Sequence, residues 1–255
     1  MRIVVVAPPR SGNHWVKCLL SRIYDLQWRG GDRKAITRAD EYREHVASGG
    51  FPDNSIFHQH CRFRSDLADA IAETPAQLVT VIRNPYDAFL SYYHWVQVRA
   101  PQDAAAGARS AERPRSRMLG RTLDDPDVLA FLANDYGPML MKANDWLHSG
   151  RALVVRFEAL NRDSVGEMQR LTDQIAPVAR ATIEGAVETC RLENVKQQRK
   201  QLARTVRHGN VGESKQALGP AHLEIFRRNF ADQIRSLGYE VREPAVAAVA
   251  GGTEA

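Results

Sequence analysis

Short apolar runs alternate with segments of helical spacing along most of the chain. The chain opens with MRIVVVA, a continuous β-branched run that is typical of a buried parallel strand. The next apolar segment, HWVKCLLSRIY, places Trp15, Leu19 and Ile23 on one face of a helix. Strand, loop and helix therefore follow one another from residue 2, which is half of a βαβ unit.

The same patterns predict three further strands and six further helices. The strands are expected at residues 55–63, 76–85 and 152–160. The helices are expected at residues 66–75, 86–98, 127–150, 164–176, 178–204 and 221–239, with a kink or break at Gly137-Pro138. Residues 27–53 show no strong period, and 209–220 are predicted to form a loop.

The alternation of strands and helices predicts an α/β fold with a central parallel sheet flanked by helices. We expect a single domain over residues 1–240 and a flexible tail over 241–255. Ligands of such sheets bind beyond the carboxyl ends of the strands. The loop after the first strand, the pair His58 and His60, and Arg83 should therefore share one crevice.

Composition narrows the class of protein without naming a ligand. The net charge of +5 and the pI near 9.3 suit a nucleotide, a nucleic acid or a lipid surface, or only a basic solvated surface. No segment reaches the ~20 apolar residues of a membrane helix, and the layout of a secretory signal is missing. The cysteines are odd in number and widely spaced (Cys18, Cys61 and Cys190), so we expect reduced thiols in a cytoplasmic protein.

The loop APPRSGNHW has the composition of an anion site. Backbone N–H groups around Ser11, Gly12 and Asn13 would lie at a helix N-terminus, where the helix dipole favours negative charge. Arg10 adds a fixed charge and a planar set of donors. A Walker loop needs GxxxxGK[ST], and the second glycine, the lysine and the magnesium hydroxyl have no counterparts here. The alternative is an ordinary strand-to-helix turn.

Two other segments carry candidate chemistry. In VIRNPYDAFLSYYHW, Arg83 at a strand end and Ser91 in the following helix could grip one phosphate, although Ser91 alone would be an ordinary solvated serine. In HQHC, His60 has the ordinary pKa that a general base for an alcohol or phenol requires. His58 and His60 could also hold a metal, but no third ligand is near in sequence, and either could be a structural histidine.

Taken together, these segments resemble the cytosolic-type sulfotransferase family, which transfers a sulfuryl group from 3′-phosphoadenosine 5′-phosphosulfate (PAPS). The stretch PRSGNHW is similar to the family's PKSGTTW loop, and RNPYDAFLSYYH is similar to RNPxDxxxSxYxH. The later stretch RHGNVGESK is similar to RKGxxGDWK, and HQH is similar to the KTH segment that carries the base. Three positions of the third motif differ, with His208, Glu213 and Ser214 in place of lysine, aspartate and tryptophan.

The resemblance implies a P-loop-type fold, a PAPS donor, a PAP product and no metal. It implies that Arg10 bridges the leaving phosphate and the moving sulfuryl group, and that His60 takes the proton of the acceptor. It also implies a donor site that comprises Arg10, Ser11, Gly12, Asn13, His14, Trp15, Arg83, Ser91, Arg207, His208 and Gly209. Asn13 and His14 replace two threonines, and Phe157 stands at the position of an adenine-contacting tyrosine.

Other readings stay open at this point. A P-loop kinase or nucleotide hydrolase is disfavoured by the missing GK[ST] and magnesium aspartate, and a basic nucleic-acid-binding protein has no recognisable reading module. We expect a small-molecule acceptor and neither a nucleic acid nor a membrane as partner. The Ala/Arg-rich composition is typical of a high-GC bacterial source, so we expect a bacterial secondary metabolite as acceptor. The segment 99–118 is either a mobile lid near the acceptor or a loop without a role, and a homodimer is left open.

Overall fold

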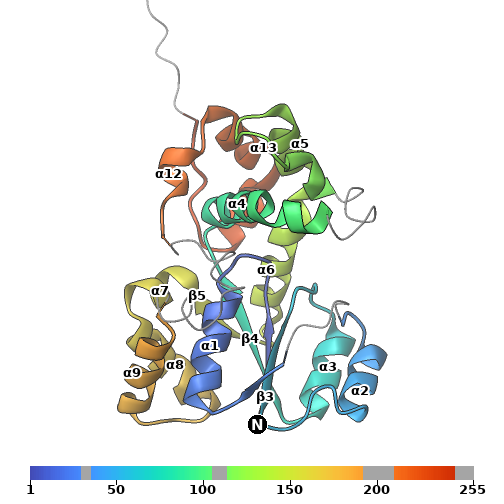
Figure 1. The fold of residues 1–255 in the computed structure, drawn as a ribbon, viewed down its shortest axis with the longest axis vertical. Helices are drawn as coiled ribbons and strands as arrows, with labels where there is room; N and C mark the ends of the chain where they lie inside the picture. Colours follow the sequence, from blue (N-terminus) through green and yellow to red (C-terminus); the bar gives the residue numbers. More distant parts are fainter. Residues whose placement is uncertain (30–35, 105–113, 192–209, 245–255) are drawn as a thin grey trace, which may run out of the picture.

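Five parallel strands form one sheet in the order β2-β3-β1-β4-β5. The computed structural model describes residues 1–29, 36–104, 114–191 and 210–244. Figure 1 shows the sheet and its helices in the lower half of the molecule, below a cluster of helices. The strands are β1 (Arg2–Val6), β2 (Gln27–Trp28), β3 (Ser55–Gln59), β4 (Ala76–Ile82) and β5 (Leu153–Arg156). The helices are α1 (Asn13–Ile23), α2 (Ala39–Ala47), α3 (Ser65–Glu73), α4 (Pro85–Ala104), the 3-10 helix η2 (Pro114–Met118), α5 (Pro126–Asp135), α6 (Gly137–Ser149), α7 (Phe157–Arg162), α8 (Ser164–Ile175), α9 (Arg180–Thr189), α12 (Ser214–Ala217) and α13 (Pro220–Ser236).

The central strand β1 is apolar on both sides because both faces of the sheet are covered. Ile3 and Val5 pack in one apolar cluster with the buried faces of α1, α8 and α9. Val4 and Val6 point the other way and pack with α2 and α3. This explains why MRIVVVA is a continuous apolar run, as parallel strands between two helical layers require.

A third apolar cluster builds the upper half of the molecule. It joins α4, α5 and α13 through aromatic side chains, among them Tyr86, Phe89 and Phe226. Helix α6 connects the two halves, since Leu140 belongs to the upper cluster and Trp146 to the cluster that contains Val4 and Val6. The carboxyl ends of β1, β3 and β4 therefore open toward the junction between the halves (Figure 1).

Several predicted elements are confirmed, and others are corrected. The single α/β arrangement, the first strand–loop–helix unit and the break at Gly137 are confirmed. The strand expected at 152–160 ends at Arg156, where α7 begins. The short strand β2 and the helix α2 lie in the stretch 27–53 that showed no period. The expected loop 99–118 is helical up to Ala104 and again from Pro114 to Met118, and its residues 105–113 lie outside the described part.

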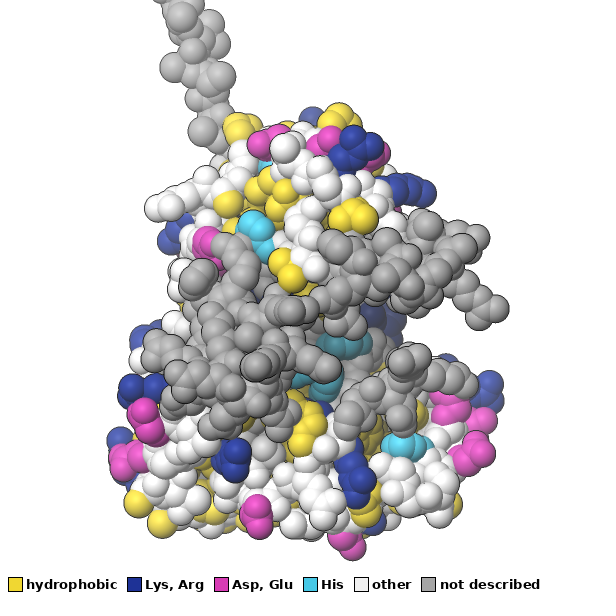
Figure 2. Space-filling view, viewed as in Figure 1, with side chains coloured by type: hydrophobic (Ala, Val, Ile, Leu, Met, Phe, Trp, Pro, Cys, Tyr) yellow, Lys and Arg dark blue, Asp and Glu magenta, His cyan; other side chains and the backbone are white. Residues whose placement is uncertain are grey.

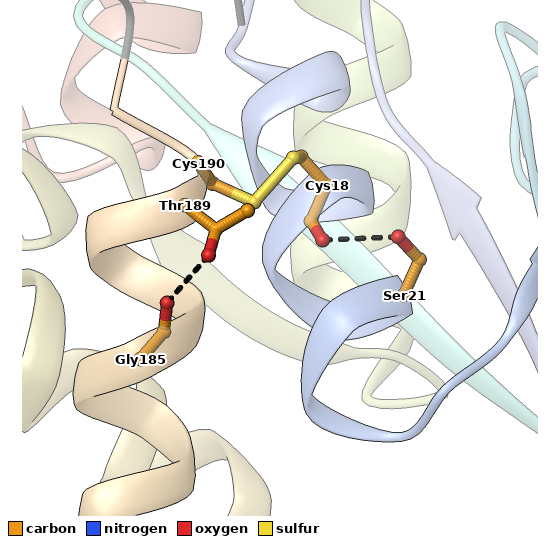
Figure 3. The surroundings of a disulfide bond; sticks show 5 residues. All are labelled: Cys18, Ser21, Gly185, Thr189 and Cys190. Carbon is orange, nitrogen blue, oxygen red and sulfur yellow. Dashed lines mark hydrogen bonds between the residues drawn. A yellow bond between two sulfur atoms is a disulfide. The ribbon is translucent and has the colours of Figure 1, made fainter. Parts of the chain in front are cut away.

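The expectation of three reduced thiols is wrong for two of them. Cys18 of α1 and Cys190 at the end of α9 form a disulfide with a Cα–Cα distance of 6.0 Å, and Figure 3 shows it linking the two helices. Only Cys61 is free among the described cysteines, and it is buried. The two bonded residues are 172 positions apart, so spacing gave no signal of the pair. In the described part of the chain no helix is both long enough and apolar enough to span a membrane.

Candidate active site

The loop between β1 and α1 is fixed by two unusual backbone conformations. Gly12 is the N-cap of α1 with φ +105°, and a Cβ at this position would lie 2.6 Å from the ring of Phe157. Arg10 also has a positive φ, of 69°. A left-handed conformation at a non-glycine residue costs free energy and persists only where the surroundings fix it. The loop is therefore shaped by its neighbours as well as by its own sequence.

Arg10 joins the loop to the helix of the second motif. Its Nε donates to Oγ of Ser91 on α4 at 3.2 Å. Its carbonyl oxygen accepts a hydrogen bond from Nη1 of Arg83 at 3.1 Å. The two segments predicted to bind phosphate therefore meet, although Arg83 and Ser91 lie 73 and 81 residues after Arg10.

Arg83 lies at the centre of this junction, directly after β4. Its Nη2 donates to the carbonyl oxygen of Asn210 at 3.2 Å, and its guanidinium lies 4.3 Å from the centroid of the Phe157 ring. Its Nε is buried and has no partner among the described residues. Its hydrogen bonds in the described part of the chain go to carbonyl oxygens and not to a carboxylate, so its positive charge is available to a bound anion.

Burial of the two guanidinium groups is electrostatically costly without an anion. Burial, with repulsion from Arg83 as a second cause, lowers the pKa of Arg10 to about 10. Burial also lowers the pKa of Arg83, against the opposing effect of Asp87 and Glu158. Arg10 stays cationic at neutral pH, since even its lowered pKa lies well above 7, and a guanidinium such as that of Arg83 is not deprotonated in proteins. A phosphate or sulfate between them would relieve their repulsion and supply acceptors for their N–H groups.

Asn84 and Pro85 of the second motif build the start of α4. The side-chain oxygen of Asn84 accepts hydrogen bonds from the backbone N–H groups of Tyr86 and Asp87, at 3.1 and 3.4 Å. The backbone N–H of Asn84 donates to Glu158 on α7 at 2.7 Å. These contacts satisfy N–H groups that a helix end otherwise leaves unpaired. They hold Arg83 at a fixed place between β4 and α4.

His60 follows β3 and lies beside the start of the loop. Its Nδ1 is 2.7 Å from the carbonyl oxygen of Ala7. A carbonyl only accepts, so Nδ1 carries the hydrogen and Nε2 is left with a lone pair in the neutral ring. Burial is the main cause that lowers the pKa of His60, so the ring is neutral at pH 7 and able to accept a proton at Nε2.

Asn13 supports this corner from α1. Its side-chain amide donates to the carbonyl oxygen of Pro8 at 2.9 Å and lies 3.5 Å from Nδ1 of His60. Asn13 is 4% exposed, and its Oδ1 is buried without a partner among the described residues. The hydrogen bond from the Asn13 amide to Pro8 therefore stabilises the turn of the loop.

His58 and His14 continue a series of ring contacts that begins at His60. The ring of His58 meets His60 and His14 at centroid distances of 5.2 and 4.9 Å, edge to face. Burial is the main cause that lowers the pKa of His58 to about 2, and its Nδ1 has no partner in the described part of the chain. His14 is exposed and stacks on Trp28 at 6.2 Å. His58 is therefore neutral across the physiological range.

The other predicted site residues fall into two groups. Ser11 is 2% exposed in the loop, and Trp15 is half-buried and packs on Phe157 at 6.0 Å, edge to face. Arg207, His208 and Gly209 lie outside the described residues. In the described part of the chain no cluster of three His, Cys, Asp or Glu side chains could hold a metal. The roles of all these residues stay predictions.

Phe157 is the site residue that sequence reasoning undervalued. It contacts Gly12, Trp15 and Arg83, which belong to both motifs. The available signal was its match to the family's adenine-contacting tyrosine, and the structure places it directly after β5, whose carboxyl end opens onto the same edge of the sheet.

The sulfotransferase domain family matches residues 1–238. The chain belongs to the sulfotransferase domain family. No curated protein matches this sulfotransferase in sequence.

Solved structures share its fold at low identity. Mouse sulfotransferase SULT7A1, complexed with PAP, is 18% identical with a TM-score of 0.64, over 92% of this chain and 84% of that one. Retinol dehydratase in complex with androsterone and the inactive cofactor PAP is 13% identical with a TM-score of 0.60, over 96% and 83%. The same enzyme with retinol and PAP is 14% identical with a TM-score of 0.61, over 95% and 83%.

Proposed function

We propose that this sulfotransferase moves a sulfuryl group from PAPS to a hydroxyl or amine of a small-molecule acceptor. The observation that carries the proposal is the junction of Arg10, Ser91 and Arg83 beside a histidine whose Nε2 is free to accept a proton. PAPS carries a phosphosulfate at one end and a 3′-phosphate on its ribose. A site that binds PAPS and uses it needs two groups of cationic donors and one base, and we assign these roles to Arg10, Arg83 and His60.

The loop is the proposed site of the phosphosulfate. Its helix N-terminus offers the backbone N–H groups of Ser11, Gly12, Asn13 and His14, and Arg10 contributes charge. Arg83 and Ser91 are the proposed ligands of the 3′-phosphate, with Arg207, His208 and Gly209 as further ligands from the third motif. Trp15 is the proposed contact of the adenine. The PAP bound in the structural neighbours supports this donor class.

His60 is the proposed general base. Its Nε2 accepts the proton as the acceptor oxygen forms a bond to sulfur, and the bond from sulfur to the 5′-phosphate oxygen breaks. Arg10 and the loop N–H groups stabilise the negative charge that gathers on the departing phosphate. No charge is left over, because the proton moves to His60 and the electron pair moves to PAP.

The acceptor is proposed to be a small organic molecule, with a bacterial secondary metabolite as the leading class. Structures of retinol dehydratase contain androsterone or retinol, which are both small organic molecules. A screen of hydroxyl and amine compounds with sulfur-labelled PAPS tests the proposal, since transfer of label identifies the acceptor. A full screen without any transfer would count against small-molecule sulfonation.

Thermal shifts test the donor class without knowledge of the acceptor. PAP should raise the melting temperature of the protein, and ATP with magnesium or RNA should not, because neither presents a 5′-phosphosulfate mimic with a 3′-phosphate. Stabilisation by ATP with magnesium alone would favour a nucleotide hydrolase or kinase. Stabilisation by RNA alone would favour a nucleic-acid-binding protein.

A further inference from the structure

Asp87 is a buried carboxylate that neither the loop nor the base uses. It lies in the first turn of α4, four residues after Arg83, and is 3% exposed. Its Oδ2 accepts the backbone N–H of Gly212 at 2.7 Å, and its Oδ1 accepts that of Ser214 at 3.0 Å. Both donors are at least 125 residues away in sequence. Hydrogen bonds to an ionised carboxylate are among the strongest available to backbone groups.

Arg242 also holds the segment 210–214, to which Gly212 and Ser214 belong. Nη2 of Arg242 donates to Oγ of Ser214 at 2.5 Å, and its guanidinium lies 4.2 Å from the centroid of the Tyr86 ring. The backbone N–H of Arg242 donates to the hydroxyl of Tyr86 at 2.9 Å. Ser214 is fully buried between the start of α4 and the chain that follows α13.

Loop 210–214 contacts the proposed phosphate site through Asn210. The carbonyl oxygen of Asn210 accepts the hydrogen bond from Nη2 of Arg83. One end of loop 210–214 therefore contacts Arg83, and its other end is bonded to Asp87 one helical turn along α4. Movement of this loop would remove an acceptor from Arg83 and leave Nη2 free to turn.

We propose that Asp87 is a positioning residue for recognition of the 3′-phosphate of the donor. Its carboxylate holds loop 210–214 against Arg83, and the loop fixes the orientation of the guanidinium that receives the phosphate. The inference rests on the proposed function, since it assigns Asp87 to the same donor site. Asp87 also lies at a helix N-terminus, where any acid stabilises the helix, so the test must separate these two roles.

The test compares two ligands that differ only in the 3′-phosphate, PAP and 5′-AMP. Asp87→Asn keeps the size of the side chain but replaces one acceptor oxygen with an NH2 group that faces a backbone N–H. We expect the Kd for PAP to rise about tenfold, as the loss of a charged hydrogen bond predicts. The Kd for 5′-AMP should change less than twofold. Titration calorimetry on the full chain measures both.

Asp66→Asn is the matched control. Asp66 also lies in the first turn of a helix, α3, but it is exposed and pairs with Arg64. This variant should leave both Kd values unchanged. Equal weakening of PAP and 5′-AMP in Asp87→Asn would show a merely structural role and overturn the inference, as would unchanged binding of PAP.

Arg242→Gln keeps the inference testable if Asp87→Asn does not fold. It removes the charged contact to Ser214 and leaves the carboxylate in place, so PAP should weaken about threefold and 5′-AMP should not. Loss of both ligands, or of neither, would overturn the inference. A wild-type protein that binds PAP no better than 5′-AMP would instead reject the proposed function itself.

Discussion

The arginine side of the site (Arg10 and Arg83) and its histidine side (His58 and His60) differ in the charge they carry when buried. On the arginine side, Arg10 and Arg83 stay cationic despite burial and donate to a serine hydroxyl and to carbonyl oxygens. On the histidine side, His58 and His60 pack edge to face, and burial keeps their rings neutral. Burial therefore leaves the two guanidinium groups charged and keeps the two imidazole rings neutral. The difference suits an anionic donor on one side and a proton transfer on the other.

The largest expected effect comes from removal of the proposed base, His60. His60→Ala should lower kcat about 10³-fold, the usual contribution of a general base. The Kd for PAP should stay nearly unchanged, because the arginine side is intact. Steady-state kinetics with PAPS and calorimetry with PAP measure the two quantities, and His148→Ala, an exposed histidine, serves as control. Retained turnover in His60→Ala would remove His60 as the base.

The pH profile of kcat sharpens the same assignment. Burial lowers the pKa of His60 below its ordinary 6.5, and the base must be neutral to act. The rate should therefore be flat at neutral pH and fall only as the pH drops below 6.5.

Removal of charge from the arginine side should instead act on donor binding. Arg83→Ala should raise the Kd for PAP about 10- to 100-fold, since a charged hydrogen bond and an electrostatic contact are lost. At saturating PAPS, kcat should change far less. Arg43→Ala, which breaks only the exposed pair with Glu73, is the control. Loss of kcat with unchanged PAP affinity would reverse the division between the two sides.

Gly12→Ala tests how tightly the loop is fixed on the arginine side. The new methyl group would meet the Phe157 ring at 2.6 Å at a backbone φ of +105°. We expect a loss of about 1–3 kcal/mol in the free energy of unfolding from backbone strain and contact together. Gly150→Ala is the matched control, because it has φ +66° and no neighbour within 4 Å. Equal losses in the two variants would show that the ring contributes nothing.

The smallest effect is expected from His58 and appears only in acid. Its pKa is about 2 in the folded protein and near 6.5 when unfolded. The unfolded chain binds the extra proton below pH 6.5, so stability falls with falling pH by up to about 1.4 kcal/mol per pH unit from this group. His58→Gln should flatten that dependence between pH 6.5 and 5 in denaturant titrations. An unchanged slope would show that His58 titrates normally.

The sequence predicted the site best where local pattern and motif coincide. The units that begin with β1, β3 and β4 each combine an apolar strand with a distinctive segment at its end, so Arg10, His60 and Arg83 could be placed at one edge of the sheet. Phe157 was obscured because ALVVRFEAL is apolar through the change from strand to helix, and a short apolar run does not reveal its period.

Contacts between distant segments were beyond the reach of local pattern. Asp87 meets loop 210–214 across more than 120 residues. The resemblance assigned both segments to one donor site, but no local pattern predicted these hydrogen bonds. The helix α2 was missed because only Ala39 and Tyr42 of its nine residues are buried, which leaves a weak apolar period.

The bond between Cys18 and Cys190 divides the chain into a covalent ring and two free arms. The ring contains β3, β4, β5 and the whole of α4, and the amino-terminal arm contains β1 and the loop of Arg10. One cut by a protease between these cysteines would open the ring without releasing a fragment, so the nicked protein would migrate as one species until a reductant is added. A cut in either arm would shorten the chain at once.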